Sequence, residues 1–300
     1  MREAGIALLF TSGLLALFIF IPSAASQKSP ASLAAEAPAA PNAFAQVSIK
    51  AEAAIVYDLA TGQTLYAKNA DAQLPLASLT KLLTVYAALA TLSLETPITI
   101  PLEATRAEAP RAFNEGQVFP LADLARLTLT ASLNDGAMAI ASATAARMNR
   151  TPDDALASAA VALALSQTYA VNGSGLDVSS AISGGYGSAY DLARLAGALV
   201  EKAPSVAAAT TEHSAEAVSL GGTSFSVQNT DPIVATIPRL LLSKTGYTDL
   251  AGGNLALVFD AGLGHPISVV VLGSSRNARF TDGEALIFAT LAHFADVASL

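Results

Sequence analysis

Two residues at the start of an apolar segment could together carry out nucleophilic chemistry. Ser78 and Lys81 stand three positions apart, and Lys81 is the only charged residue between Ser78 and Leu89. On an α-helix, side chains at this spacing lie on one face. A lysine in apolar surroundings has a lowered pKa, so its neutral amine could take the proton of the Ser78 hydroxyl as that hydroxyl attacks a carbonyl carbon. The same pattern also fits a serine helix cap beside a lysine that extends to solvent.

Two further short motifs stand at the boundaries of predicted elements. Ser132-Leu133-Asn134 comes where a leucine-rich helical segment gives way to Asn134-Asp135-Gly136, and Lys244-Thr245-Gly246 ends a strand-like run. Each motif alone fits a turn, a helix cap or a sheet edge. The Ser-x-Asn pattern also recurs at Ser275-Arg276-Asn277. The order of all three motifs along the chain is therefore more informative than any single one.

The elements that would position these motifs include both strands and helices. Strand-like runs cover Ala53–Asp58, Gln63–Lys68, Arg239–Lys244, Asn254–Asp260 and Pro266–Gly273. Helical patterns cover Ser78–Leu89, Leu121–Met148, Tyr190–Val200 and Asp282–Val297, with a Gly/Ser-rich break over Asn172–Ser188. We therefore predict an α+β fold with an antiparallel five-stranded sheet flanked by helices. A mainly helical lobe, over about residues 84–200, is expected between the two halves of the sheet.

The composition limits the classes of function. The 16 Lys and Arg against 24 Asp and Glu give a net charge of −8, which disfavours general binding to nucleic acid or anionic lipid. The chain has no Cys, which excludes disulfides, thiolate metal sites and cysteine nucleophiles. His213, His265 and His293 are interpreted as solvated loop or helix residues. A Ser-His-Asp hydrolase is disfavoured because no Gly-x-Ser-x-Gly elbow accompanies them.

The first 46 residues predict export from the cytoplasm. Arg2 precedes an apolar run over Ala4–Ile21, and small residues follow up to Ser26. Residues 1–25 are therefore either a signal peptide cleaved before Ser26 or a retained N-terminal membrane anchor. Residues 26–46 are rich in Ala and Pro and are predicted to be a linker, followed by a catalytic domain over 47–300. The catalytic domain is then extracytoplasmic, in the periplasm or at the cell surface.

With this trio of motifs, the chain resembles the low-molecular-mass penicillin-binding proteins, the serine D-alanyl-D-alanine carboxypeptidases. The resemblance runs from about Ala53 to Val297. It includes the three motifs and the stretches Leu76–Lys81, Asn172–Asp177, Lys244–Thr248 with Ala251-Gly252, and Arg279–Asp282. It implies a fold like that of β-lactamases and transpeptidases, with no metal and no cofactor.

The resemblance also implies roles for nine residues. Ser78 would be acylated by the penultimate D-Ala carbonyl of a peptidoglycan stem peptide, with Lys81 as the general base. Ser132 would relay a proton to the leaving D-alanine, and Asn134 would orient Lys81. The substrate would be bound along the strand by Lys244, Thr245, Gly246, Tyr247 and Thr248, and the backbone N–H groups of Ser78 and Tyr247 would form the oxyanion hole. β-Lactams would be covalent inhibitors.

The sequence departs from the family pattern next to the third motif. Asn229-Thr230-Asp231 ends in Asp where the family usually has a second Asn, and Leu241-Leu242-Ser243 replaces a Gly-containing approach to Lys244. These departures affect expected substrate contacts and leave the chemistry in place.

Three alternative functions were considered beside the carboxypeptidase. An endopeptidase that cuts D-Ala cross-links uses the same machinery and remains open. A β-lactamase is disfavoured because no Glu-x-x-Leu-Asn pattern lies between Asn134 and Lys244. A non-catalytic module that binds penicillin or cell wall is disfavoured because all the polar catalytic positions are present.

Overall fold

The computed structural model describes residues 42–262 and 264–298. The predicted signal peptide or anchor over residues 1–25, and the predicted linker up to residue 41, lie outside the described residues. Among those described, no helix has the length and apolar character needed to cross a membrane. Phe44, near the end of the predicted linker, is buried, and its ring centroid lies 5.7 Å from that of Tyr66 and 6.0 Å from that of His293.

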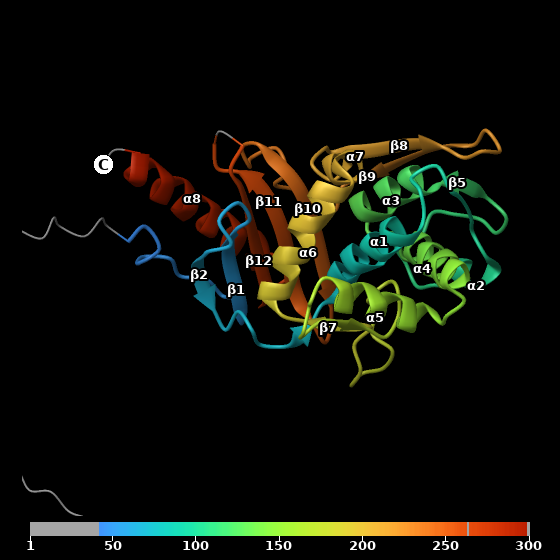
Figure 1. Ribbon diagram of the computed structural model, residues 1–300, viewed down its shortest axis with the longest axis horizontal. Coiled ribbons are helices and arrows are strands. Elements are labelled where there is room, and N and C mark those ends of the chain that lie inside the picture. Colours follow the sequence, from blue (N-terminus) through green and yellow to red (C-terminus); the bar gives the residue numbers. More distant parts are fainter. Residues whose placement is uncertain (1–41, 263, 299–300) are drawn as a thin grey trace, which may run out of the picture. The chain divides into compact units, whose positions relative to one another are not determined.

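A five-stranded antiparallel sheet with the order β10-β11-β12-β1-β2 forms the centre of the fold (Figure 1). Its strands are β1 (Ala53–Asp58), β2 (Thr64–Lys68), β10 (Leu240–Thr248), β11 (Gly252–Asp260) and β12 (Pro266–Ser274). Within the sheet Ala53 pairs with Leu272, so strands from distant parts of the sequence lie side by side. The predicted five-stranded sheet, with its first hairpin and its closing meander, is thus confirmed. Strand β10 runs four residues beyond the predicted end at Lys244, and so includes Thr248.

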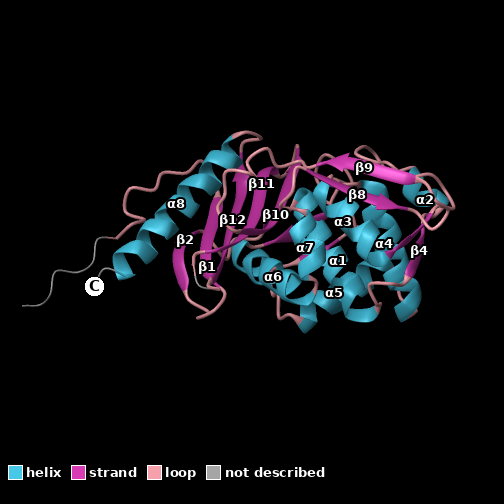
Figure 2. Ribbon diagram, turned by 90° about the horizontal axis from the view of Figure 1, so that it is seen from above, coloured by secondary structure: helices cyan, strands magenta, loops and turns pink. Residues whose placement is uncertain are grey.

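Helices cover both faces of the sheet. α6 (Ala189–Lys202) packs on one face and α8 (Ala278–Ala298) on the other, as Figure 2 shows from above. The side chains of β1 alternate between two cores: Ala53 and Ile55 join the core that includes α6, whereas Ala54 and Val56 join the core beneath α8. A strand covered on both faces needs apolar residues at every position, which explains the continuous apolar run.

The remaining helices form the lobe beside the sheet. They are the 3₁₀ turn η1 (Ala77–Leu79), α1 (Thr80–Thr91), α2 (Leu102–Thr105), α3 (Leu121–Thr130), α4 (Asn134–Met148), α5 (Pro152–Ala162) and α7 (Pro204–Ala209). Short strands accompany them: β3 (Leu74–Pro75), β4 (Pro97–Thr99), β5 (Val118–Pro120), β6 (Tyr169–Ala170), β7 (Gly185–Gly187), β8 (Ser214–Val218) and β9 (Ser224–Gln228). α1 lies against α4, α5 and α6, which accounts for its apolar residues on several faces. The hairpin of β8 and β9, which the sequence did not predict, packs on α3.

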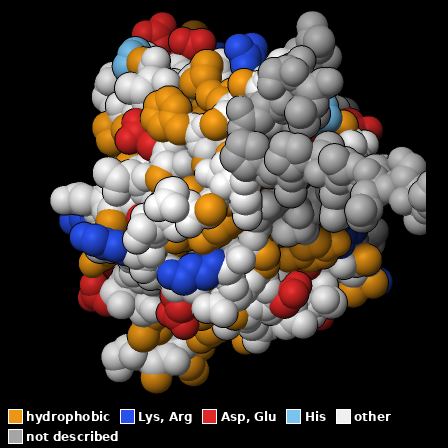
Figure 3. Space-filling model, turned by 90° about the vertical axis from the view of Figure 1, so that its left-hand side faces the viewer, with side chains coloured by type: hydrophobic (Ala, Val, Ile, Leu, Met, Phe, Trp, Pro, Cys, Tyr) orange, Lys and Arg blue, Asp and Glu red, His pale blue; other side chains and the backbone are white. Residues whose placement is uncertain are grey.

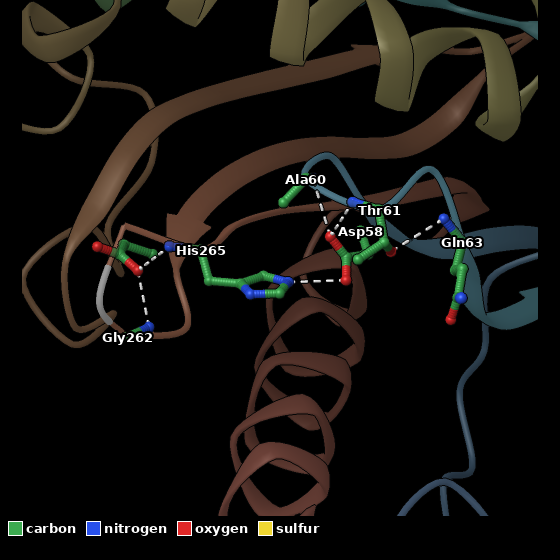
Figure 4. A network of polar contacts seen from close by, with 7 residues as sticks. Asp58, Ala60, Thr61, Gln63, Gly262 and His265 are labelled. Carbon is green, nitrogen blue, oxygen red and sulfur yellow. Dashed lines mark hydrogen bonds and ion pairs between the residues drawn. The ribbon is translucent and has the colours of Figure 1, made fainter.

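A polar network joins two turns at the end of the sheet where β1 and β11 finish (Figure 4). Asp58 Oδ1 accepts hydrogen bonds from the N–H groups of Ala60 and Thr61, at 2.9 and 3.0 Å. Asp58 Oδ2 lies 2.7 Å from Nε2 of His265, whose backbone N–H donates to Asp260 Oδ1 at 2.9 Å. His265, expected to be a solvated loop residue, is therefore a partner that holds the β11–β12 turn against the β1–β2 turn.

Candidate active site

The first motif lies where η1 leads into α1. Ser78 is in η1 and half-buried, and it makes no side-chain cap to the helix. Lys81 Nζ donates a hydrogen bond to Ser78 Oγ at 2.7 Å. The three-residue spacing therefore joins the two side chains across the junction of a 3₁₀ turn and an α-helix, and the helix-cap interpretation does not apply.

The Lys81 ammonium is completely buried, and its three donors are all used. Besides Ser78 Oγ, it donates to Asn134 Oδ1 and to the Ser174 carbonyl oxygen, each at 2.7 Å. All three acceptors are formally neutral. Burial and then the nearby Lys244 charge hold the pKa of Lys81 well below its ordinary value, and Asp135 opposes this shift. The site thus disfavours the charged form of Lys81 relative to an exposed lysine. In the neutral form Nζ keeps two N–H donors and gains a lone pair, which can accept the proton of the Ser78 hydroxyl.

The second motif lies in a turn between α3 and α4. The helical pattern over Leu121–Met148 is divided at this motif, the boundary at which the leucine-rich segment was predicted to end, and Ser132 adopts a left-handed φ of 59°. Two backbone bonds fix the turn: Leu133 N–H donates to Thr128 O at 3.0 Å, and Asn134 N–H donates to Pro110 O at 2.7 Å. The turn directs the Ser132 hydroxyl to Lys244 Nζ, which donates to it at 2.9 Å.

Asn134 connects this turn to the nucleophile. Its Oδ1 accepts from Lys81, and its Nδ2 donates to the Glu108 carbonyl oxygen at 2.9 Å. The adjacent Asp135 carboxylate accepts from the N–H groups of Ala112 and Phe113, both at 2.7 Å. Asn134 and Asp135 therefore fasten the preceding loop to α4, and this holds the Asn134 amide in one orientation.

The third motif lies within β10, at the edge of the sheet that faces the lobe. Lys244 is 1% exposed and donates to Ser132 Oγ and to the Thr245 carbonyl oxygen, the latter at 2.7 Å. Burial and then the Arg279 charge lower the pKa of Lys244 to about 7, while Asp231 acts in the opposite direction. Thr245 Oγ1 lies 2.6 Å from Thr230 Oγ1.

Gly246 lies where β10 passes close to the turn that contains Ser78. A Cβ atom at this position would lie 2.9 Å from the Leu76 carbonyl oxygen and 3.2 Å from the Ser78 nitrogen. Both are backbone atoms, which cannot move aside as a flexible side chain can. Glycine is therefore required if the strand edge is to lie against the turn that holds Ser78.

Tyr247 and Thr248 lie further along β10. Tyr247 is 38% exposed, and the Arg276 guanidinium lies 4.2 Å from the centroid of its ring. Thr248 Oγ1 donates to Asp177 Oδ1 at 3.0 Å. Both residues line a groove of about 480 Å³ with Glu108, Asp177 and Asp249 among its walls.

The structure brings five of the nine predicted residues into one cluster that contains two separate hydrogen-bonded groups: Ser78, Lys81, Asn134, Ser132 and Lys244. Its two parts are Ser78–Lys81–Asn134 and Ser132–Lys244, with the two lysines coupled through their charges. Thr245 and Gly246 border the cluster, and Tyr247 and Thr248 lie beyond it along the strand.

Three contributors to the site were not assigned a role from the sequence. They are the Ser174 carbonyl oxygen bound by Lys81, the Thr230 hydroxyl beside Thr245, and Arg279, whose Nη1 donates to the Gly246 carbonyl oxygen. Ser174 and Arg279 fall within stretches that carry the family resemblance, which was the available signal. A contact made through a backbone carbonyl has no residue-type signature, so pattern analysis cannot identify it.

This arrangement can attack a carbonyl group next to a bound anion. A serine hydroxyl and an amine of lowered pKa form a nucleophile–base pair, and a second lysine offers positive charge nearby. Within residues 42–262 and 264–298, no group of three or more His, Asp or Glu side chains is placed to hold a metal ion. The Ser78–Lys81 pair and the buried Lys244 suit acyl transfer from a substrate that carries a carboxylate.

Comparisons with known proteins agree with this chemistry. The model of the family described as D-alanyl-D-alanine carboxypeptidase matches residues 37–276. No curated protein sequence matches the chain.

Several solved structures share the fold. Penicillin-binding protein D2 from Listeria monocytogenes, in its ampicillin-bound form, is 26% identical with a TM-score of 0.68, over 81% of this chain and 98% of that one. D-alanyl-D-alanine carboxypeptidase from Mycobacterium tuberculosis is 24% identical with a TM-score of 0.69, over 84% and 92%. A point mutant of the Streptomyces K15 DD-transpeptidase is 23% identical with a TM-score of 0.71, over 82% and 99%.

Proposed function

Because this chain belongs to the D-alanyl-D-alanine carboxypeptidase family, we propose that it removes the terminal D-Ala from peptidoglycan stem peptides through an acyl-enzyme on Ser78. The reaction takes place at the cluster of Ser78, Lys81, Ser132, Asn134 and Lys244, here called the cleft. The protein is a serine-type D-Ala-D-Ala carboxypeptidase, a hydrolase. The observation that supports Ser78 is its 2.7 Å hydrogen bond with the fully buried Lys81.

Acylation follows from the arrangement of the two lysines. Neutral Lys81 takes the proton of the Ser78 hydroxyl as Oγ attacks the carbonyl carbon of the penultimate D-Ala. Lys244 and the Thr245 hydroxyl bind the C-terminal carboxylate of the peptide. The peptide C–N bond then breaks, and the proton taken up by Lys81 passes through the Ser132 hydroxyl, which lies 2.9 Å from Lys244 Nζ, to the nitrogen of the leaving D-alanine. Lys81 is neutral again at the end of this step.

Deacylation returns the enzyme to its starting state. A water molecule attacks the ester carbonyl carbon and gives a proton to neutral Lys81, which returns it to Ser78 Oγ as the ester C–O bond breaks and the shortened peptide is released. The backbone N–H groups of Ser78 and Tyr247 stabilise the oxyanion in both steps. Asn134 holds Lys81 in place through its Oδ1 atom.

A covalent label tests this assignment. A fluorescent penicillin is expected to label the wild-type protein, and Ser78→Ala is expected to give no labelled band. The exposed Ser93→Ala serves as a matched control and should label as the wild type does. Undiminished labelling of Ser78→Ala would remove Ser78 as the nucleophile.

Two substrates separate the carboxypeptidase from the endopeptidase. The enzyme is incubated with a stem pentapeptide and, separately, with a D-Ala cross-linked dimer, and the products are separated by mass. Release of free D-alanine from the pentapeptide supports the carboxypeptidase. Cleavage of the dimer alone would instead assign the cross-link endopeptidase.

The proposed partners and location follow from the family. A Listeria relative with this fold binds ampicillin in one structure and cefotaxime in another, and we propose β-lactams as covalent inhibitors of this protein as well. An extracytoplasmic location is supported by the apolar run over Ala4–Ile21. Fractionation of cells that express the full chain tests it, and recovery in the cytoplasm would contradict it.

A further inference from the structure

A buried carboxylate lies behind the strand that carries Lys244. Asp231, in the loop between β9 and β10, is 2% exposed. Its Oδ1 accepts the N–H of Ile233 at 2.9 Å, and its own N–H donates to Asn229 Oδ1 at 2.9 Å. A carboxylate with so little exposure needs partners that compensate for the lost water.

The strongest of these partners is on β10 itself. The Ser243 hydroxyl donates to Asp231 Oδ2 at 2.6 Å. Burial raises the pKa of Asp231 above its ordinary value, and the hydrogen bonds from Ser243 and Ile233 and the Arg279 charge act in the opposite direction. Ser243 is 2% exposed, and its N–H donates to Thr210 Oγ1 at 2.9 Å. Because Lys244 is the next residue, the contact links Asp231 directly to the backbone that carries the ammonium.

These two residues are the same two positions at which the sequence departs from the family pattern. The family usually has an uncharged Asn where this chain has Asp231, and the hydroxyl of Ser243 belongs to the altered approach to Lys244. In the structure the side chains at these two positions are hydrogen-bonded to each other, so the two departures belong to one local feature. The pair adds a negative charge that an amide would not supply.

The negative charge of Asp231 lies close to several buried cations. Lys81, Lys244 and Arg279 are all buried in this part of the molecule. The charged groups that face Lys244 are Lys81 from α1, Arg279 from α8 and Asp231 from its loop. Asp231 in turn faces Arg279 and Glu284, and Arg279 faces Arg276 and Tyr247. Asp231 acts against burial and Arg279, both of which drive the proton from Lys244.

We propose that the Asp231 carboxylate, fixed to β10 by the Ser243 hydroxyl, is a positioning residue that keeps Lys244 charged to bind the substrate carboxylate. This inference rests on the proposed function of the cleft. Asp231 acts through Lys244 and touches no substrate. Its loss weakens binding at alkaline pH, where the Lys244 proton is most easily lost.

The test is the pH profile of Asp231→Asn, which removes the charge with little change of shape. The second-order rate of labelling by a fluorescent penicillin, and KM for a stem pentapeptide, are measured from pH 6 to pH 10. The alkaline limb of the labelling rate is expected to move to lower pH by about one unit, which is a roughly tenfold loss near pH 9. The loss should appear in KM rather than in kcat.

Two further variants exclude a merely structural effect. Ser243→Ala should move the limb in the same direction by a smaller amount, because the carboxylate loses its best donor. Asp282→Asn is the matched control: Asp282 is also buried and accepts the Ser274 hydroxyl at 2.7 Å, but it is not among the charges that act on Lys244. The alkaline limb of the labelling rate of Asp282→Asn should coincide with that of the wild type.

The outcomes separate this inference from the proposed function. If the wild type labels and the limb of Asp231→Asn stays in place, the role of Asp231 is wrong and the function stands. An equal shift in Asp282→Asn would likewise overturn the role of Asp231. If the wild type does not label, or Ser78→Ala labels equally, the proposed function itself fails.

Discussion

Two buried polar networks in the described part of this molecule have opposite effects on the charged form of their central side chain. At the end of β1, the Asp58 carboxylate receives two backbone N–H groups and His265. Burial alone would raise the pKa of Asp58, but the hydrogen bonds from His265 and Thr61 outweigh it and the pKa is lowered. In the cleft, Lys81 donates to formally neutral oxygens, and its pKa is also lowered, by burial and by Lys244.

The difference teaches what separates a reactive site from a structural one. For Asp58 a lowered pKa means that the charged form is favoured, so the network stabilises the fold. For Lys81 the same direction means that the charged form is disfavoured, so the network costs stability and yields a base. Hydrogen bonds are complete in both places, and only the balance of charge differs. On the described surface at the sheet end, by contrast, positive and negative side chains are interspersed (Figure 3).

The largest expected effect is on the reactive side of this comparison. Lys81→Met removes the base and should slow labelling by a fluorescent penicillin by about 10²- to 10⁴-fold. The exposed Lys202→Met is the control and should label at the wild-type rate. A Lys81→Met rate close to that of the wild type would show that the buried amine is not the base.

The next effect concerns the close approach of β10 to the nucleophile. Gly246→Ala places a methyl group 2.9 Å from the Leu76 carbonyl oxygen, so strand and turn must separate. A shift of this kind should slow labelling by about 10²-fold. Gly221→Ala, where the nearest atom would be 3.8 Å away, should leave the rate unchanged. Normal labelling of Gly246→Ala would mean that the cleft tolerates a wider gap.

The structural network should respond in stability and not in activity. Asp58→Asn leaves three donors with a weaker acceptor and should lower the free energy of unfolding by about 1–3 kcal/mol, measured by urea denaturation. Labelling should remain at the wild-type rate. The exposed Asp71→Asn should change neither quantity. A loss of labelling in folded Asp58→Asn would show that the two networks are coupled.

The two networks also differ in the pH dependence of stability, which has a separate window for each network. Lys81 and Lys244 have folded pKa values below their unfolded values, so the unfolded state binds more protons between about pH 7 and 10. Stability should therefore rise with pH there, by at most about 1.4 kcal/mol per pH unit for each group. Asp58 has a lowered folded pKa, so its contribution should be present above about pH 4 and lost as the pH falls further.

Urea midpoints from pH 3 to pH 10 check both windows. Lys244→Met should flatten the alkaline rise, and Asp58→Asn should reduce the acid loss. A fall in wild-type stability between pH 7 and pH 9 would reverse the sign assigned to the cleft lysines.

The sheet strands and the contact between Ser78 and Lys81 could be predicted from the sequence because both depend on short-range patterns. β1 is a continuous apolar run of strand-forming residues, and its observed bounds match the prediction. The Ser78–Lys81 spacing also survives a local difference, since side chains three residues apart face each other in a 3₁₀ turn as they do in an α-helix. The three-residue spacing therefore predicts the same side-chain contact whichever of the two helix types forms.

Other parts of the site could not be predicted because tertiary contacts determine them. The sequence placed Ser132 at the end of a helical segment, but the left-handed form of the turn depends in part on a contact from outside it, in which Asn134 N–H donates to the Pro110 carbonyl oxygen. In the sequence, Asp231 and Ser243 are two separate departures from the family pattern. In the structure, a hydrogen bond between their side chains joins a loop to a strand. The pairing becomes visible only once β10 lies beside that loop.

The pairing of β1 with β12 also sets the order in which the molecule can assemble. Lys50, just before β1, donates its N–H to the Asp282 carboxylate 232 residues later. Contacts so distant along the chain must await its last portion, and they slow folding. While it is being synthesised, the protein therefore carries Ser78 and Lys81 on an unfinished scaffold, with both side chains still hydrated. A chain interrupted before β12 would lack the sheet against which the lobe packs, and we expect it not to react with penicillin.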